Sequence, residues 1–118
     1  MVVKIASFFA LLFAYCSTAA AQDIGGRYQS DGIDPKGMHF TLNAEIEVLP
    51  QNTCRIKWSD GSAGICILKD KILAVSYLIH GKLGLSLYEV SSDGNIEGDF
   101  IDDFHGGGIG KEKLIPVR

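Results

Sequence analysis

Hydrophobic and polar residues alternate along most of the chain after residue 22. The alternation is clearest in residues 38–49, where the apolar positions are Phe40, Leu42, Ala44, Ile46 and Val48. Residues 72–79 repeat it with Leu73, Val75, Tyr77 and Ile79, and residues 83–91 with Leu83, Leu85 and Leu87. A period of two places one face of a strand in the core and the other in water. These apolar sets are therefore predicted to face inward.

Turn-forming residues recur about every ten positions and divide the chain into short strand-like segments. The turns are 34–37, 50–52, 59–61, 69–71, 80–82, 92–94 and 105–108. The segments between them are 25–31, 38–49, 53–58, 62–68, 72–79, 83–91, 95–102 and 109–117. No segment has convincing helical periodicity. This pattern predicts an all-β fold, an eight-stranded antiparallel up-and-down barrel or a closely related sandwich. Because the strands are short, we expect the barrel interior to be filled by its own side chains.

The first residues have the features of a secretory signal peptide. Lys4 precedes an apolar run from Ile5 to Tyr15, and Ala19 and Ala21 occupy the small-residue positions before a cleavage site. The apolar run is shorter than the ~20 residues that a membrane-spanning helix needs. A lipoprotein signal ending at Cys16 is disfavoured, because Tyr15 stands where such signals have a small residue. We predict a signal peptide over 1–21 and a single β-barrel domain over 22–118.

Composition narrows the range of partners. The whole chain has a formal net charge of −3, and removal of Lys4 with the signal peptide makes the remainder more acidic. An acidic chain lacks the attraction that nucleic acid or an anionic membrane surface requires. We expect a periplasmic or secreted protein that does not span a membrane and does not bind nucleic acid.

Cys54 and Cys66 flank the turn at 59–61, and exported proteins usually pair such residues. If they lie opposite each other, Ile65 and Ile67 fall on the polar face with Arg55 and Lys57. A two-residue turn at 60–61 would instead pair Cys54 with Ile67 and separate the cysteines. The compartment favours the disulfide, and a bulge near Gly64 would reconcile it with an apolar strand face.

No pattern of catalytic or metal-ligating residues stands out. Acidic residues at 97, 99, 102 and 103, followed by His105, suit a hard cation, but they lack a recognised ligand spacing, and a solvated strand end and loop is the favoured interpretation. His39, His80 and His105 lack zinc-site spacing. No nucleophile elbow, zincin motif or phosphate-binding glycine loop occurs. We expect no catalytic residue, no metal and no cofactor. The candidate binding residues are Trp58, Arg55, Lys57 and His105.

Several short motifs resemble a group of short exported proteobacterial proteins. They are Gly26-Arg27-Tyr28, Cys54-Arg55-Ile56-Lys57-Trp58, Gly64-Ile65-Cys66, Tyr88-Glu89-Val90 and Asp93-Gly94-Asn95-Ile96-Glu97-Gly98. Some members of this group are labelled fibronectin-binding, which implies an adhesin-like role. The layout also resembles avidin-like and lysozyme-inhibitor barrels. However, the chain has a single tryptophan where avidin-like sites use several, and residues 62–66 do not reproduce the Ser-Gly-x-x-Tyr loop of the inhibitors.

Together these features predict an exported, non-enzymatic binding module of the bacterial envelope or surface, with an adhesin-like role as the form that the resemblance implies. The alternative is a periplasmic inhibitor of a hydrolase such as lysozyme, for which the long loop from His105 would supply the blocking residue. The partner, a protein or a small ligand, and the oligomeric state are left open by the sequence.

Overall fold

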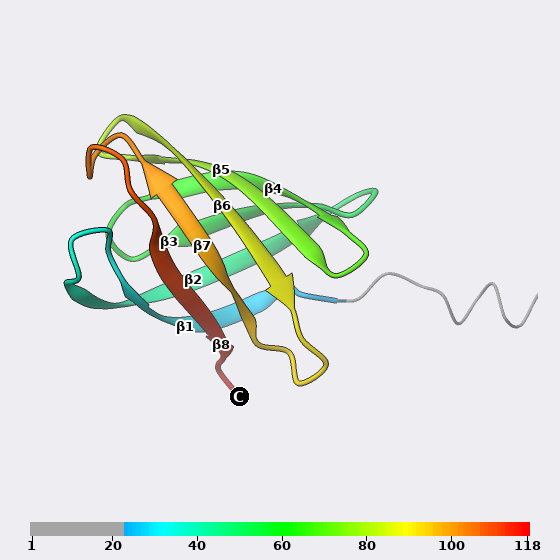
Figure 1. Ribbon diagram of the computed structural model, residues 1–118. Helices are drawn as coiled ribbons and strands as arrows, with labels where there is room; N and C mark the ends of the chain where they lie inside the picture. Colours follow the sequence, from blue (N-terminus) through cyan, green and yellow to red (C-terminus); the bar gives the residue numbers. More distant parts are fainter. Residues whose placement is uncertain (1–22) are drawn as a thin grey trace, which may run out of the picture.

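Eight strands form one closed antiparallel barrel in the computed structural model, which describes residues 23–118 (Figure 1). Each strand pairs with the next along the chain, and the last pairs with the first. The strands are β1 (Gly26–Ile33), β2 (His39–Leu49), β3 (Thr53–Trp58), β4 (Ala63–Lys69), β5 (Ile72–Ile79), β6 (Lys82–Val90), β7 (Ile96–Asp102) and β8 (Gly110–Pro116). The predicted all-β barrel is confirmed. The predicted signal peptide and its cleavage site lie outside the described residues.

Alternate residues of each strand point into the barrel and form its core. Leu73 and Val75 of β5 are fully buried, as predicted, and Tyr77 follows them inward. On β2, Ala44 and Ile46 are buried, whereas Val48 is exposed. The prediction for Val48 was wrong because β1 pairs with β2 only as far as Ile46, so Val48 extends past the end of the neighbouring strand.

The inward face of β6 is the opposite of the predicted one. Leu83, Leu85 and Leu87 point outward, while Gly84, Ser86 and Tyr88 point inward. The cause is the pairing with β5, which sets Gly84 opposite Tyr77 and Ser86 opposite Val75. A side chain at position 84 would overlap the ring of Tyr77, so this part of the interior has room only for glycine.

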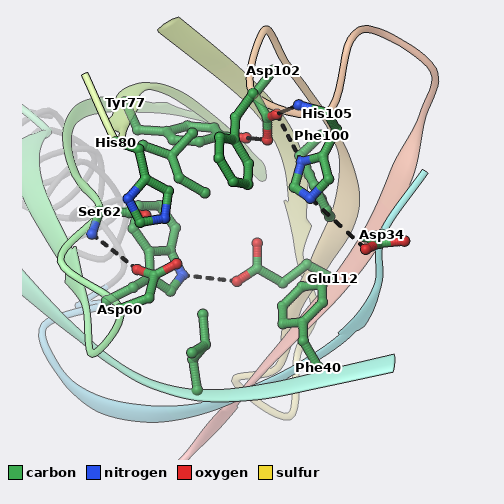
Figure 2. A pocket seen from close by; sticks show the side chains of 14 residues that line it. Asp34, Phe40, Asp60, Ser62, Tyr77, His80, Phe100, Asp102, His105 and Glu112 are labelled. Atoms are coloured by element: carbon green, nitrogen blue, oxygen red, sulfur yellow. Dashed lines mark hydrogen bonds and ion pairs between the residues drawn. The ribbon is translucent and has the colours of Figure 1, made fainter. Parts of the chain in front are cut away.

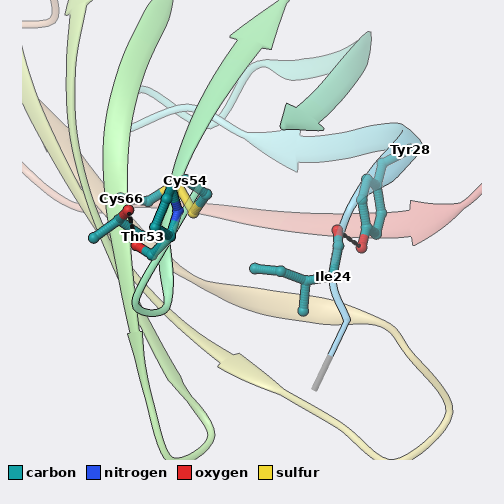
Figure 3. The surroundings of a disulfide bond; sticks show 6 residues. Ile24, Tyr28, Thr53, Cys54 and Cys66 are labelled. Carbon is teal, nitrogen blue, oxygen red and sulfur yellow. Dashed lines mark hydrogen bonds between the residues drawn. A yellow bond between two sulfur atoms is a disulfide. The ribbon is translucent and has the colours of Figure 1, made fainter. Parts of the chain in front are cut away.

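The β3–β4 hairpin joins Cys54 to Cys66 in a disulfide, with Cα atoms 4.9 Å apart (Figure 3). The Trp58 N–H donates to the Ser62 carbonyl at 2.9 Å, so the loop holds three residues, Ser59 to Gly61, and not the two of the alternative. The added residue shifts the register by one position and brings the cysteines together.

The register between β3 and β4 is continuous from Thr53 to Lys57, so the anticipated bulge near Gly64 is absent. Instead, Ile65 and Ile67 lie on the outside with 66% and 55% of their surface exposed. The structure thus satisfies the disulfide by placing apolar side chains in water.

The two ends of the barrel differ. At the end where β1 begins and β8 finishes, which also holds the disulfide, Ile24 is buried and its carbonyl accepts a 2.6 Å hydrogen bond from the Tyr28 hydroxyl (Figure 3). Buried side chains such as Ile24, Cys54 and Leu68 occupy the interior at this end, beside a separate pocket that also involves Asp23, Val48 and Asn52. The opposite end, formed by the β1–β2, β3–β4, β5–β6 and β7–β8 loops, contains a cavity, so the expectation of a filled interior was wrong there.

Candidate functional site

A cavity of about 230 Å³ opens at the end of the barrel formed by the β1–β2, β3–β4, β5–β6 and β7–β8 loops (Figure 2). Its wall combines aromatic and aliphatic side chains with carboxylates. The lining residues are Asp34, Phe40, Leu42, Trp58, Asp60, Ser62, Tyr77, Ile79, His80, Phe100, Asp102, Phe104, His105 and Glu112. An apolar pocket with a few convergent polar groups is the usual form of a small-molecule site.

Glu112 of β8 is the main polar group of the cavity and is only 7% exposed. Its Oε2 atom accepts hydrogen bonds from the Ser30 hydroxyl at 2.5 Å and from the Trp58 indole N–H at 2.8 Å. Its Oε1 atom accepts one from the Tyr88 hydroxyl at 2.6 Å. Side chains from three strands, β1, β3 and β6, therefore donate to one buried carboxylate on β8, and these bonds fix its orientation.

Glu112 faces inward because it shares the parity of Leu114 and Gly110 on β8, while Lys111 and Lys113 alternate to the outside. Lys111 pairs there with Asp99 at 2.9 Å and Lys113 with Glu97 at 3.9 Å. The flanking lysines therefore cannot neutralise Glu112 directly.

A second polar chain runs along the rim of the cavity. The Tyr77 hydroxyl donates to Asp102 Oδ2 at 3.1 Å, and Asp102 Oδ1 lies 2.7 Å from His105 Nδ1. On its other side, His105 Nε2 lies 3.8 Å from Asp34 Oδ2 (Figure 2). The backbone N–H of His105 also donates to Asp102 at 2.8 Å. His105 thus links the β7–β8 loop to the β1–β2 loop.

Burial shifts the acidity of the tyrosines in these networks. Burial, followed by the charge of Asp102 and the hydrogen bond to it, raises the pKa of Tyr77. Burial and Glu112 raise the pKa of Tyr88 well above its ordinary 10.0. Both hydroxyls therefore stay protonated and act as donors at neutral pH.

Asp34 shows the opposite shift. Backbone N–H groups of Met38 and Lys36 donate to its carboxylate at 2.9 Å each, and the bond from Met38 is the largest cause of a lowered pKa. Electrostatic interactions with His105 and Lys36 lower the pKa of Asp34 further. Asp34 is therefore a carboxylate at the cavity rim at neutral pH.

Beneath the cavity, the Ser86 hydroxyl is buried and has no hydrogen-bond partner in the part of the chain that the structure describes. It lies on β6 between Leu85 and Leu87 and points inward. The hydroxyls of Tyr77 and Tyr88 donate to Asp102 and Glu112 and not to Ser86.

The candidate binding residues predicted from the sequence fall on two sides of the wall. Trp58 and His105 line the cavity. Arg55 and Lys57, on β3, alternate with Ile56 and Trp58 and face the outside, where Arg55 lies 3.6 Å from Glu47. The four residues therefore do not form one site.

The acidic residues near the end of β7 are also divided. Glu97 and Asp99 face the outside with their lysine partners, whereas Asp102 faces the cavity. Within residues 23–118, no group of three or more histidine, cysteine or acidic side chains is arranged to hold a metal ion.

Sequence reasoning missed most of the site: Glu112, Asp102 as a cavity residue, Asp34 and Phe100. Only the parity of Glu112 with Leu114 hinted that this carboxylate is buried. The hint is weak, because Lys111 and Lys113 make the segment look like an ordinary solvated strand.

On the outside of β4 to β7 lies a group of exposed aliphatic side chains, here called the outer apolar face. It consists of Ile65, Ile67, Leu78, Leu83, Leu85, Leu87 and Ile101. Cross-strand pairing places Leu85 opposite Ile101 and Leu78 opposite Leu83, so the group is continuous over neighbouring strands. A contiguous exposed apolar surface of this kind often marks a contact with another molecule.

Among residues 23–118, no helix has the length and apolar character needed to cross a membrane. Comparison of the sequence with models of known protein families and with curated proteins finds no match.

Proposed function

We propose that the protein is an exported, non-enzymatic binding module that takes a small ligand into the open end of its barrel. The observation that carries the proposal is the cavity of about 230 Å³ with Glu112 buried in its wall. A buried carboxylate costs stability unless its acceptors are satisfied. Glu112 is buried beside a space that side chains do not fill, and this position favours a role in binding.

Export rests on two supports. The first residues carry the pattern of a signal peptide. The Cys54–Cys66 disulfide is consistent with an oxidising compartment outside the cytoplasm. The proposed location is therefore the periplasm or the extracellular medium.

The test is nuclear magnetic resonance of the purified 15N-labelled protein, titrated with aromatic fragments that are cationic, neutral or anionic. We expect at least one fragment to shift the Trp58 indole N–H signal and the amides of Gly81 and His105, at the cavity end. Amides of Val90 and Ile96, which are buried at the opposite end of the barrel, serve as the internal control. A Leu42→Trp variant, which places a larger side chain in the cavity wall, should abolish the shifts.

Absence of any shift at the cavity end across the whole fragment set would contradict the proposal. Shifts that persist unchanged in the Leu42→Trp variant would do so as well, because they would place the ligand elsewhere.

A protein partner is the second candidate, favoured by the outer apolar face. The resemblance to proteins labelled fibronectin-binding makes an adhesin-like contact the form to test. Binding to immobilised fibronectin should fall when Leu85→Asp places a charge in that face, while Leu42→Trp should leave it unchanged. Equal binding by the wild type and Leu85→Asp would eliminate this face as the contact.

The inhibitor alternative has less support. The imidazole of His105 turns inward to Asp102 and Asp34, so it does not project as a blocking residue. Phe104 is exposed on the same loop, but its ring packs against His80, with centroids 4.7 Å apart. The loop is thus attached to the barrel rim.

A further inference from the structure

The polar groups of the cavity are mostly acceptors. Four carboxylates line it, from Asp34, Asp60, Asp102 and Glu112, and its lining includes no lysine or arginine. Several lining groups that can donate are already engaged: the Tyr77 hydroxyl donates to Asp102, the Trp58 indole N–H donates to Glu112, and His105 Nδ1 lies 2.7 Å from Asp102 Oδ1. The remaining side-chain donors are the Ser62 hydroxyl and the ring of His80. A ligand that fits this wall must therefore supply hydrogen-bond donors and positive charge.

Glu112 retains capacity for such a donor. A carboxylate offers roughly four acceptor positions, and three are occupied, two on Oε2 and one on Oε1. Figure 2 shows this carboxylate projecting among the lining side chains, with Asp60 on one side and Phe40 on the other. The three existing hydrogen bonds orient the carboxylate, and they therefore also fix the direction of the remaining acceptor position on Oε1.

The remaining wall is apolar and largely aromatic. Phe40 and Phe100 meet edge to face with centroids 5.9 Å apart, and Trp58 packs against Tyr77 at 5.4 Å. Aromatic faces attract both cations and apolar groups. A ligand for this wall therefore combines a charged head with an apolar arm.

The volume limits the size of the ligand. An apolar cavity of 150 Å³ is large enough for benzene, so about 230 Å³ accommodates about nine non-hydrogen atoms. This lies below the 300–1,000 Å³ range of sites for drug-sized ligands. The cavity thus fits a metabolite-sized molecule and excludes a peptide or an oligosaccharide from its interior.

We infer that the cavity selects a small primary amine with an apolar arm, whose ammonium group donates to Glu112 and whose arm packs between the aromatic side chains. The inference rests on the proposed function, because it names the class of ligand for the same cavity. An ammonium group also brings positive charge to a wall that carries four carboxyl groups and no lysine or arginine, a gain that a neutral molecule of the same shape lacks.

The test is isothermal titration calorimetry of the purified protein at pH 7 with three probes: 2-phenylethylamine, 2-phenylethanol and phenylacetate. The first two have the same shape and about nine non-hydrogen atoms, so they differ in charge and donor capacity alone. We expect the amine to bind on the order of tenfold more tightly than the alcohol, since a charge-assisted bond replaces a neutral one. Phenylacetate should show no binding.

Variants assign the preference to the carboxylates. Glu112→Gln should reduce the amine-over-alcohol ratio to about one, while Glu97→Gln, the same change on the outer surface, should leave it intact. Because Glu112→Gln also disturbs buried hydrogen bonds, Asp60→Asn provides a second variant on an exposed turn, and it should lower the ratio by a smaller factor. Folding of each variant is checked by its circular dichroism spectrum.

The outcomes separate this inference from the proposed function. If the alcohol binds at the cavity end as tightly as the amine, or phenylacetate binds best, the ligand class is wrong while the binding function stands. If no probe binds and no fragment shifts the cavity signals, both are wrong. A preference for the amine that is unchanged in both Glu112→Gln and Asp60→Asn would also overturn the inference.

Discussion

Trp58 and Glu112 stand 54 positions apart in the sequence, yet the indole N–H of one donates to the carboxylate of the other across 2.8 Å. The bond joins β3 to β8 through the interior, between strands that are not neighbours in the barrel. It ties the only tryptophan of the chain to the polar group on which the proposed ligand site depends. Structure and binding therefore share one set of contacts.

Glu112 is predicted to contribute strongly to stability. Glu112→Ala leaves the buried donors of Ser30, Trp58 and Tyr88 without their acceptor, and should lower the free energy of unfolding by about 2–5 kcal/mol. Glu112→Gln keeps one acceptor and should cost about 1–3 kcal/mol. Urea unfolding measures both changes. Glu47→Ala, which removes an exposed partner of Arg55, should stay within about 0.5 kcal/mol. A cost for Glu112→Ala as small as that of Glu47→Ala would contradict the network.

Leu73 faces the interior on β5 and Leu85 faces outward on β6, so we expect substitutions of the two leucines to have very different effects on the free energy of unfolding. Leu73 is fully buried, so Leu73→Ala should cost about 2–5 kcal/mol. Leu85 is 53% exposed, so Leu85→Ala should change stability by less than about 1 kcal/mol. Urea unfolding of the two variants distinguishes this register from the reverse one, in which the Leu85 variant would be the more damaged.

A methyl group at Gly84 should be destabilising, and removal of the Tyr77 ring should relieve the effect. It would overlap the ring of Tyr77, so Gly84→Ala should cost about 1–3 kcal/mol. Combining it with Tyr77→Ala should lower the penalty in a double-mutant cycle of unfolding free energies. Gly98→Ala is the control, because its added methyl group would meet the backbone of Leu87, and Tyr77→Ala should not rescue it. Equal rescue of both would argue against a specific contact with the ring.

Reduction of the disulfide should lower the melting temperature without abolishing the fold. The bond closes a short hairpin that the Ser59–Gly61 loop already restrains, so we expect it to contribute roughly 1–3 kcal/mol. Titration of the denatured, unreduced protein should find no free thiol at Cys54 or Cys66. A Cys54→Ala/Cys66→Ala variant should melt at the same temperature with and without reductant. Two free thiols would show that the bond does not form.

Alkaline pH should destabilise the protein. Because burial and the neighbouring carboxylates raise the pKa of Tyr77 and Tyr88 above 10.0, these hydroxyls remain protonated in the folded state while those of the unfolded chain ionise. Stability is therefore full below about pH 10 and falls as the pH rises further, by about 1.4 kcal/mol per pH unit for each tyrosine. Urea unfolding at several alkaline pH values measures the slope, and Tyr77→Phe should reduce it by the share of one tyrosine. Phenolate absorbance from the folded protein near pH 10 would refute this.

The strands were predictable because their signals are local. Turn residues such as Asp60-Gly61 and His80-Gly81 fall between the observed strands, and alternation on β5 identified its buried face. Alternation on β6 failed, since both faces of that strand carry apolar or small residues and the packing of Tyr77 over Gly84 decides between them. The disulfide was predicted from the compartment, against the register that a two-residue turn would give, and the three-residue loop removes that conflict.

The site was not predictable in the same way. Glu112, Asp102 and Tyr77 come from three strands that meet only when the barrel closes, and no spacing in the sequence relates them. Trp58 and His105 were singled out as candidates, but as members of a set with Arg55 and Lys57, which the barrel wall places on the other side. Glu112 is buried between Lys111 and Lys113 because alternate residues of β8 face inward, and the sequence alone does not show which alternate set faces the interior.

Closure of the barrel has a consequence for any macromolecular partner. Since β1 pairs with β8, the strands among the described residues have no free edge, and a partner cannot extend the sheet by adding a strand of its own. Recognition must proceed through side chains on the outer wall or in the end loops. Substitutions there leave the hydrogen-bonded ladder intact, so during evolution this barrel is free to exchange one partner for another while its scaffold stays the same.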